Sequence, residues 1–182
     1  MNFKKLRTKT TIYFAAEIIL VILFGYLFIE IAEDLLKEDL KPFDFAVIEL
    51  IQSNISDKWT IIMKGITFFG GQQWLIMATA IGGLILFFTY RRYGIYLMLT
   101  MAGGGMFNLV LKHLFERERP SFYRIIEAQG YSFPSGHSMS SFIFFTACAV
   151  ILVKISKNVL ADVLISLFFC MLVLAIGISR IY

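Results

Sequence analysis

The chain has 182 residues, of which 58% are hydrophobic and 16% are charged, and its formal net charge is +4. A mean hydropathy of +0.75 excludes an ordinary soluble domain and indicates an integral membrane protein, with room for about five spans of ~20 residues. No nucleic-acid partner is expected, because the basic residues stand beside apolar runs rather than on a separate basic face. Cys148 and Cys170 lie within apolar runs without metal-ligand spacing, so free thiols are expected.

Five apolar segments are long enough to be membrane spans. The first follows a basic N-terminus without a small-residue cleavage site, so it is expected to stay as an anchor. It contains Glu17, which we interpret as an end-proximal charge that reaches headgroup water or a lysine; a functional intramembrane carboxylate is the alternative. The sequence therefore predicts an all-α, polytopic transmembrane helix bundle in one membrane domain, 1–182, with spans at about 11–31, 71–90, 94–114, 135–153 and 159–178.

Two shorter segments also have helical patterns. In 43–54, apolar residues at helical spacing alternate with acidic ones, which favours a helix along the membrane surface, with a helix packed among loops as the alternative. The segment 59–69 is too short to cross and contains Lys64, so it is interpreted as a second surface or partly embedded helix. Within the third span, the run Gly103-Gly104-Gly105 should let a neighbouring helix approach closely.

The distribution of charge predicts the orientation. With a cytoplasmic N-terminus, five crossings place residues 1–10, the Arg91-Arg92 turn and the 154–157 turn inside, and these segments contain eight basic residues and no acidic one. This agrees with the positive-inside rule. The stretch from Lys112 to His137 and the region of Arg180 then lie on the outer face.

Cations collect at the end of the third span. Lys112 follows Asn108 by one helical turn, and Arg119 would share its face if the helix continued. Pro120 disfavours helix at Arg119, so the chain is expected to turn there, with both cations projecting toward one volume. An ammonium and a guanidinium suit the oxygens of a phosphate group.

The segment Pro134-Ser135-Gly136-His137 supplies the complement. Ser135 fits the N-cap of the fourth span, whose N-terminal N–H groups form an anion site that Gly136 leaves open. His137 would lie beside that anion and could donate a proton to a leaving alkoxide, and Arg180 can reach in as a third cation. Interface anchors and a plain helical histidine are the alternative, but this clustering on the outer face opposes the positive-inside bias.

These residues resemble the signatures of the phosphatidic acid phosphatase type 2 superfamily, in its membrane lipid phosphatase branch. Lys112, six residues and Arg119-Pro120 are similar to the first signature, and Pro134 to His137 are similar to the second. Ser179-Arg180 is similar to the start of the third, which in the family continues through five residues to a histidine.

The resemblance implies a six-helix membrane enzyme, with five spans present here, that removes phosphate from a lipid without a metal or cofactor. It implies that Lys112, Arg119 and Arg180 bind phosphate, that Ser135 and Gly136 complete the cradle, and that His137 is the general acid, with Asn108, Pro120 and Pro134 as supporting residues. The implied substrates include phosphatidic acid, phosphatidylglycerol phosphate, diacylglycerol pyrophosphate and undecaprenyl pyrophosphate.

The family's nucleophile is the histidine of the third signature, and the 182 residues contain only His113 and His137. His113 is rotated about 100° from Lys112 on its helix, so it is not assigned that role. The leading expectation is a lipid phosphatase sequence interrupted inside its third signature. A catalytically silent lipid-phosphate binder or membrane scaffold is the second hypothesis, and a transporter component is a weaker third.

Overall fold

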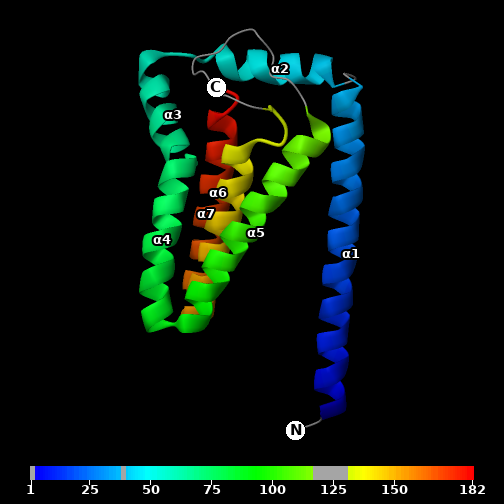
Figure 1. Ribbon diagram of the computed structural model, residues 1–182, viewed down its shortest axis with the longest axis vertical. Coiled ribbons are helices and arrows are strands. Elements are labelled where there is room, and N and C mark those ends of the chain that lie inside the picture. Colours follow the sequence, from blue (N-terminus) through cyan, green and yellow to red (C-terminus); the bar gives the residue numbers. More distant parts are fainter. Residues whose placement is uncertain (1–2, 38–39, 117–130) are drawn as a thin grey trace. The chain divides into compact units, whose positions relative to one another are not determined.

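The computed structural model describes residues 3–37, 40–116 and 131–182, and every regular element within them is an α-helix (Figure 1). Seven helices follow one another along these described segments. They are α1 (Phe3–Leu36), α2 (Lys41–Gln52), α3 (Asp57–Phe69), α4 (Gln72–Thr89), α5 (Arg91–Phe115), α6 (Gly136–Ile155) and α7 (Val159–Ser179). The predicted all-α class is confirmed.

By length and composition, five helices of the described chain are able to cross a membrane, as predicted. They are Phe14–Leu35 within α1, and the whole of α4, α5, α6 and α7. Helix α1 runs unbroken from Phe3 to Leu36, so it extends beyond both ends of the predicted first span, 11–31. Helices α2 and α3 lie at the two shorter predicted segments, and their location on the membrane surface stays a prediction.

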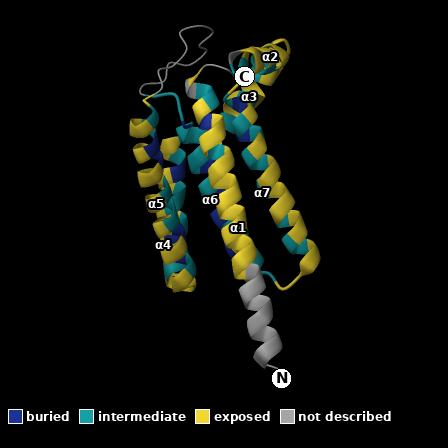
Figure 2. Ribbon diagram, turned by 90° about the vertical axis from the view of Figure 1, so that its right-hand side faces the viewer, coloured by how far each residue is buried: buried dark blue, intermediate teal, exposed yellow. Residues whose placement is uncertain are grey.

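The chain divides into two compact units, Met1–Val47 and Ile48–Tyr182, and the expectation of one membrane domain over 1–182 stays a prediction. In the first unit, every residue from Phe14 to Leu27 is exposed, Glu17 included (Figure 2). An apolar surface of this extent suits contact with lipid rather than with water.

In the second unit, α6 packs against α4, α5 and α7 around a buried apolar core. Aromatic rings form much of it: the Phe145 ring stacks on that of Phe169 with centroids 5.8 Å apart, and Trp74 meets Phe144 edge to face at the same distance. Exposed residues line the outer faces of these helices (Figure 2). The core members are Leu75, Leu97, Phe144, Phe145, Ala147, Ile151 and Ile176.

The close approach predicted at the glycine run is confirmed at Gly104. A Cβ atom at this position would collide with the side chain of Ile143 on α6, whereas one at Gly103 or Gly105 would meet nothing within 4 Å. Gly104 therefore lets α5 and α6 pack tightly, as small residues do between membrane helices. This packing fixes how the end of α5 faces the start of α6.

Candidate phosphate-binding site

Three helix ends gather at one end of the second unit. Helices α5 and α7 finish there, α6 begins there, and the junction of α3 and α4 lies beside them. At that junction, a Cβ atom on Gly70 would lie 2.6 Å from Ile176 Cγ2 of α7 and 3.8 Å from the backbone oxygen of His137. The sequence-predicted segments around residues 112, 135 and 180 are thus brought to one place.

Helix α5 ends at Phe115, before the turn that Pro120 predicted at Arg119. Its C-cap, Glu116, has left-handed backbone angles (φ 43°, ψ 27°), and its N–H donates a hydrogen bond to the Lys112 oxygen. The chain leaves the helix one turn after Lys112, so the helix does not continue toward residue 119 on the Lys112 face. Arg119 and Pro120 themselves lie outside the described residues.

Two aromatic contacts hold the segment before α6 against the end of α5. Phe115 meets Phe133 edge to face with ring centroids 5.2 Å apart, and His113 meets Tyr131 in the same manner at 6.1 Å. The next residue, Pro134, is buried and joined to Phe133 by a cis peptide bond. These contacts bring the start of α6 back to Lys112, and they place the imidazole of His113 on Tyr131.

Ser135 caps α6, as its sequence predicted. Its hydroxyl oxygen accepts hydrogen bonds from the Ser138 N–H at 3.4 Å and from the Ser138 hydroxyl at 3.1 Å. A side-chain cap of this kind satisfies one of the N–H groups that lack an intrahelical partner in the first turn. The positive end of the helix dipole is therefore fixed at Gly136 and His137.

Gly136 lies directly against the side chains at the end of α5. A Cβ atom built on Gly136 would lie 3.7 Å from Lys112 Nζ and 3.7 Å from Asn108 Oδ1. Asn108 is buried, and its Nδ2 donates to Met139 Sδ on α6 at 3.1 Å. The first lysine, the glycine and the supporting asparagine thus form one cluster, in which the ammonium faces the first turn of α6.

His137 occupies the first turn of α6 and is half-buried. Its backbone oxygen accepts a hydrogen bond of 2.7 Å from the hydroxyl of Ser141, a fully buried residue. The backbone at His137 is therefore fixed from within α6 and from the Gly70 side. His137 follows Gly136 directly, so its imidazole belongs to the same helix end as the Lys112 contact.

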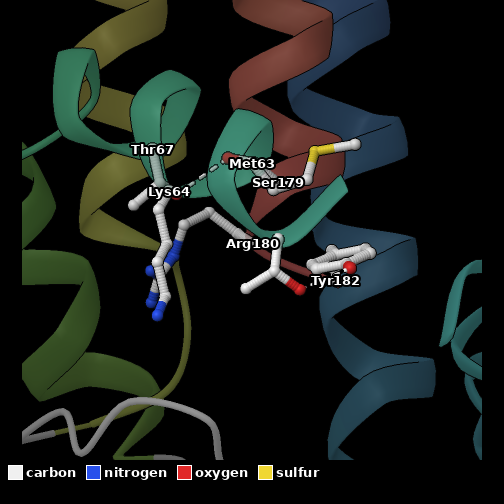
Figure 3. Close-up of a pocket in the computed structure, with 7 residues that line it drawn as sticks. Met63, Lys64, Thr67, Ser179, Arg180 and Tyr182 are labelled. Atoms are coloured by element: carbon white, nitrogen blue, oxygen red, sulfur yellow. Dashed lines mark hydrogen bonds between the residues drawn. The ribbon is translucent and has the colours of Figure 1, made fainter. Parts of the chain in front are cut away.

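Arg180 forms the C-cap of α7 and lines a small pocket of about 50 Å³ (Figure 3). The same pocket is lined by Lys64 of α3, which sequence patterns did not predict at the site. A hydrogen bond of 2.8 Å between the hydroxyls of Thr67 and Ser179 joins α3 to the end of α7. Thr60, Lys64 and Thr67 share one helical face by their spacing, but that spacing alone does not show that the face packs against the end of α7. The remaining lining residues are Met63 and Tyr182.

The chemistry of this end of the unit is that of an anion site. It combines an ammonium, a guanidinium and a capped helix N-terminus, each of which stabilises negative charge. Among the described residues, no three His, Cys, Asp or Glu side chains are grouped so as to hold a metal ion. The side chains of Lys112 and Arg180 and the backbone N–H groups of α6 supply positive charge at this end of the unit.

Known proteins of one family are similar to this chain. Residues 93–182, which include every described site residue named above except Lys64 and its neighbours on α3, match the model of the PAP2 superfamily. Over 126 residues the chain is 32% identical to phosphatidylglycerophosphatase B of Bacillus subtilis (strain 168). This match covers 66% of the chain, and the chain spans 61% of that relative's length.

One solved structure is similar in fold to the chain. It is the crystal structure of a transmembrane PAP2 type phosphatidylglycerolphosphate phosphatase from Bacillus subtilis, with a TM-score of 0.76 and 29% sequence identity. The match covers 86% of this chain and 80% of the other. Together with the five apolar helices of the described chain, it makes this a multi-pass membrane protein.

Proposed function

The chain belongs to the PAP2 superfamily, and from this premise we propose that it acts as a membrane lipid phosphatase, hydrolysing a phosphate monoester or pyrophosphate on a lipid. The observation that supports this most directly is the contact between motifs. Lys112 Nζ lies against Gly136 at the capped N-terminus of α6, and the two residues come from separate signatures. A phosphate group placed there would meet an ammonium and the helix N-terminus together.

In the proposed reaction, Lys112, Arg119 and Arg180 bind the phosphate oxygens, while Ser135 and Gly136 form the floor of the cradle. A histidine nucleophile attacks phosphorus, the bond from phosphorus to the leaving oxygen breaks, and His137 gives its proton to that oxygen. Water then hydrolyses the phosphohistidine. No metal ion takes part in this route, because the cations and the helix N-terminus stabilise the developing charge.

The nucleophile is assigned to no residue of these 182. The two histidines are His137, which the proposal uses as the acid, and His113, whose ring packs on Tyr131. These residues therefore account for phosphate binding and for proton donation. That division favours one second candidate, a lipid-phosphate binder or membrane scaffold without turnover, because binding needs the cradle alone.

The substrate is proposed to be a phosphatidic acid, phosphatidylglycerol phosphate or undecaprenyl pyrophosphate type of lipid, presented by the bilayer; no nucleic acid takes part.

We place the site on the extracytoplasmic face of the plasma membrane with the N-terminus in the cytoplasm. Two observations support this orientation. Arg91 begins α5, and its distance from Lys112 along the helix is about 30 Å. Lys154 likewise lies at the far end of α6 from Gly136. Arg91 and Lys154, in the turns expected inside, are therefore at the opposite helix ends from Lys112 and Gly136.

The test is the release of inorganic phosphate from short-chain phosphatidic acid by the protein of the longest reading frame that contains this sequence. Release that persists in EDTA and is abolished by His137→Ala supports the proposal. The matched control is His113→Phe, which removes the second imidazole but keeps an aromatic ring against Tyr131, and it should retain release. A protein that binds the lipid but releases no phosphate is instead the silent binder.

A further inference from the structure

The pocket between α3 and the end of α7 contains a cation outside the three signatures, Lys64. We propose that Lys64 and Arg180 together form a subsite for a second phosphate group on the lipid headgroup, so that Lys64 selects lipids with two phosphates over lipids with one. This inference rests on the proposed function, because it adds a specificity-determining residue to the same site.

The direction of Lys64 is fixed by its neighbours on α3. Thr60 lies four residues before it and Thr67 three residues after it, so all three share one helical face. The Thr60 hydroxyl is 2.8 Å from that of Tyr182, and the Thr67 hydroxyl is 2.8 Å from that of Ser179. Lys64 lies on the helical face between these two hydrogen bonds and lines the pocket at the end of α7, where Arg180 is the C-cap.

The lining of the pocket suits an oxyanion. Its seven residues include two cationic side chains and no acidic side chain, and the hydroxyls pair with one another across the helix interface. In Figure 3 the side chains of Lys64 and Arg180 extend toward the same edge of the pocket. Among the residues that the structure describes, Lys64 forms no ion pair. An ammonium and a guanidinium at one edge are a pair of groups that phosphate oxygens accept hydrogen bonds from.

The subsite adjoins the cradle and shares Arg180 with it. Thr67, on its wall, is three residues before Gly70, whose Cβ position is 3.8 Å from the His137 oxygen. Lys64 is three residues farther back, so its Cα lies roughly 9 Å along the helix from Gly70. At that distance Lys64 is placed for a phosphate that neighbours the reacting one, with Arg180 at the boundary of the two groups.

The experiment compares two lipids with the same short acyl chains, phosphatidylglycerophosphate with two phosphate groups and phosphatidic acid with one. Equilibrium binding to the 182-residue chain is measured in phosphatidylcholine nanodiscs, with diacylglycerol as the phosphate-free reference. Lys64→Ala should weaken phosphatidylglycerophosphate binding about tenfold and phosphatidic acid binding less than about twofold. Lys64→Arg should restore the preference, because it returns a cation to the pocket. Lys58→Ala, on the same helix but outside the pocket, is the matched control and should leave both affinities unchanged.

Three results would overturn the subsite. The first is that Lys64→Ala weakens the binding of both lipids equally, and the second is that it weakens the binding of neither. The third is that Lys64→Ala weakens the binding of inorganic phosphate, measured by its competition with the lipid, as much as it weakens phosphatidylglycerophosphate binding. The last would assign Lys64 to free phosphate. Because Lys64 is exposed, Lys64→Ala should have the same melting temperature as the parent chain. If Lys64→Ala is instead less stable, the lipid preference of Lys64→Arg tests the subsite. If the parent chain binds phosphatidic acid no better than diacylglycerol, the proposed function fails instead.

Discussion

The ammonium of Lys112 lies against Gly136, with 3.7 Å from Nζ to the position that a Cβ atom would take on the glycine. Lys112 lies in the last turn of α5, and Gly136 is the first residue of α6. The absence of a side chain at Gly136 keeps the space between a cation and a helix N-terminus open. The phosphate group of the lipid is proposed to bind in that space.

Filling this space should separate binding from folding. In Gly136→Ala the new methyl group would be at ordinary contact distance from Lys112 and Asn108, so the helix should form with its melting temperature nearly unchanged. Affinity for phosphatidic acid should fall by about tenfold or more, because the methyl group occupies the approach of the phosphate. Unchanged affinity in a well-folded variant would show that the phosphate binds elsewhere.

Removal of the lysine should remove a charge-assisted contact. Lys112→Ala is expected to cost about 1.5–3 kcal/mol of phosphate binding, which is roughly 10- to 100-fold in affinity. Lys112→Arg should keep part of it, since the cation remains while its geometry changes. Binding is measured in nanodiscs at two salt concentrations, with Lys154→Ala at the opposite helix end as the control. Equal affinities for Lys112→Ala and Lys154→Ala would contradict the assignment.

Asn108 should stabilise the packing of α5 against α6, and should affect phosphate binding only through that packing. Its side chain is buried and donates to Met139 Sδ, so Asn108→Ala leaves a space and breaks the link between α5 and α6. We expect a loss of about 1–2 kcal/mol in stability, seen as a lower melting temperature. Met106→Ala, at an exposed position of the same helix, should change it little. A larger loss of stability in Met106→Ala than in Asn108→Ala would contradict the supporting role of Asn108.

The hydroxyl pair that joins α3 to α7 should be measurable as a coupling energy. Thr67 Oγ1 and Ser179 Oγ are 2.8 Å apart, so a double-mutant cycle of Thr67→Val and Ser179→Ala should give about 0.5–1.5 kcal/mol. Thr89→Val is the comparison, since the Thr89 hydroxyl donates only within its own helix, to the Ile85 oxygen. Additive single-mutant effects at 67 and 179 would mean that the contact does not stabilise α3 on α7.

The proposed orientation is open to a labelling experiment. With Cys148 and Cys170 replaced by alanine, a single cysteine is introduced in place of Ser53 or of Lys157, both of which are exposed. A membrane-impermeant maleimide added to intact bacterial cells should label the cysteine at 53, on the outer side, and leave the one at 157 unlabelled until the cells are opened. The reverse pattern would place the site in the cytoplasm.

The helices were accessible from sequence because local patterns encode them, and the Lys112 and Gly136 ends were expected at the same face because successive spans run in opposite directions. Long apolar runs specify spans, and Ser135 before an apolar run specifies a helix start. The predicted third span, 94–114, ends within one residue of the end of α5 at Phe115, but the left-handed Glu116 that ends the helix has no sequence signal. Lys64 was interpreted only as a charge that keeps 59–69 out of the bilayer core. Its place at the site depends on the hydrogen bonds of Thr60 with Tyr182 and of Thr67 with Ser179. Each of these pairs is separated by more than 100 positions in the sequence, so no local pattern encodes the contact.

The central claim is that this end of the helix bundle binds the phosphate group of a lipid. Equilibrium binding of phosphatidic acid and of diacylglycerol with the same acyl chains, measured on the 182-residue chain in phosphatidylcholine nanodiscs, tests it without requiring turnover. Phosphatidic acid should bind at least about tenfold more tightly, and the difference should disappear when Lys112→Ala and Gly136→Ala are combined. Equal binding of the two lipids by the unmodified chain would contradict it.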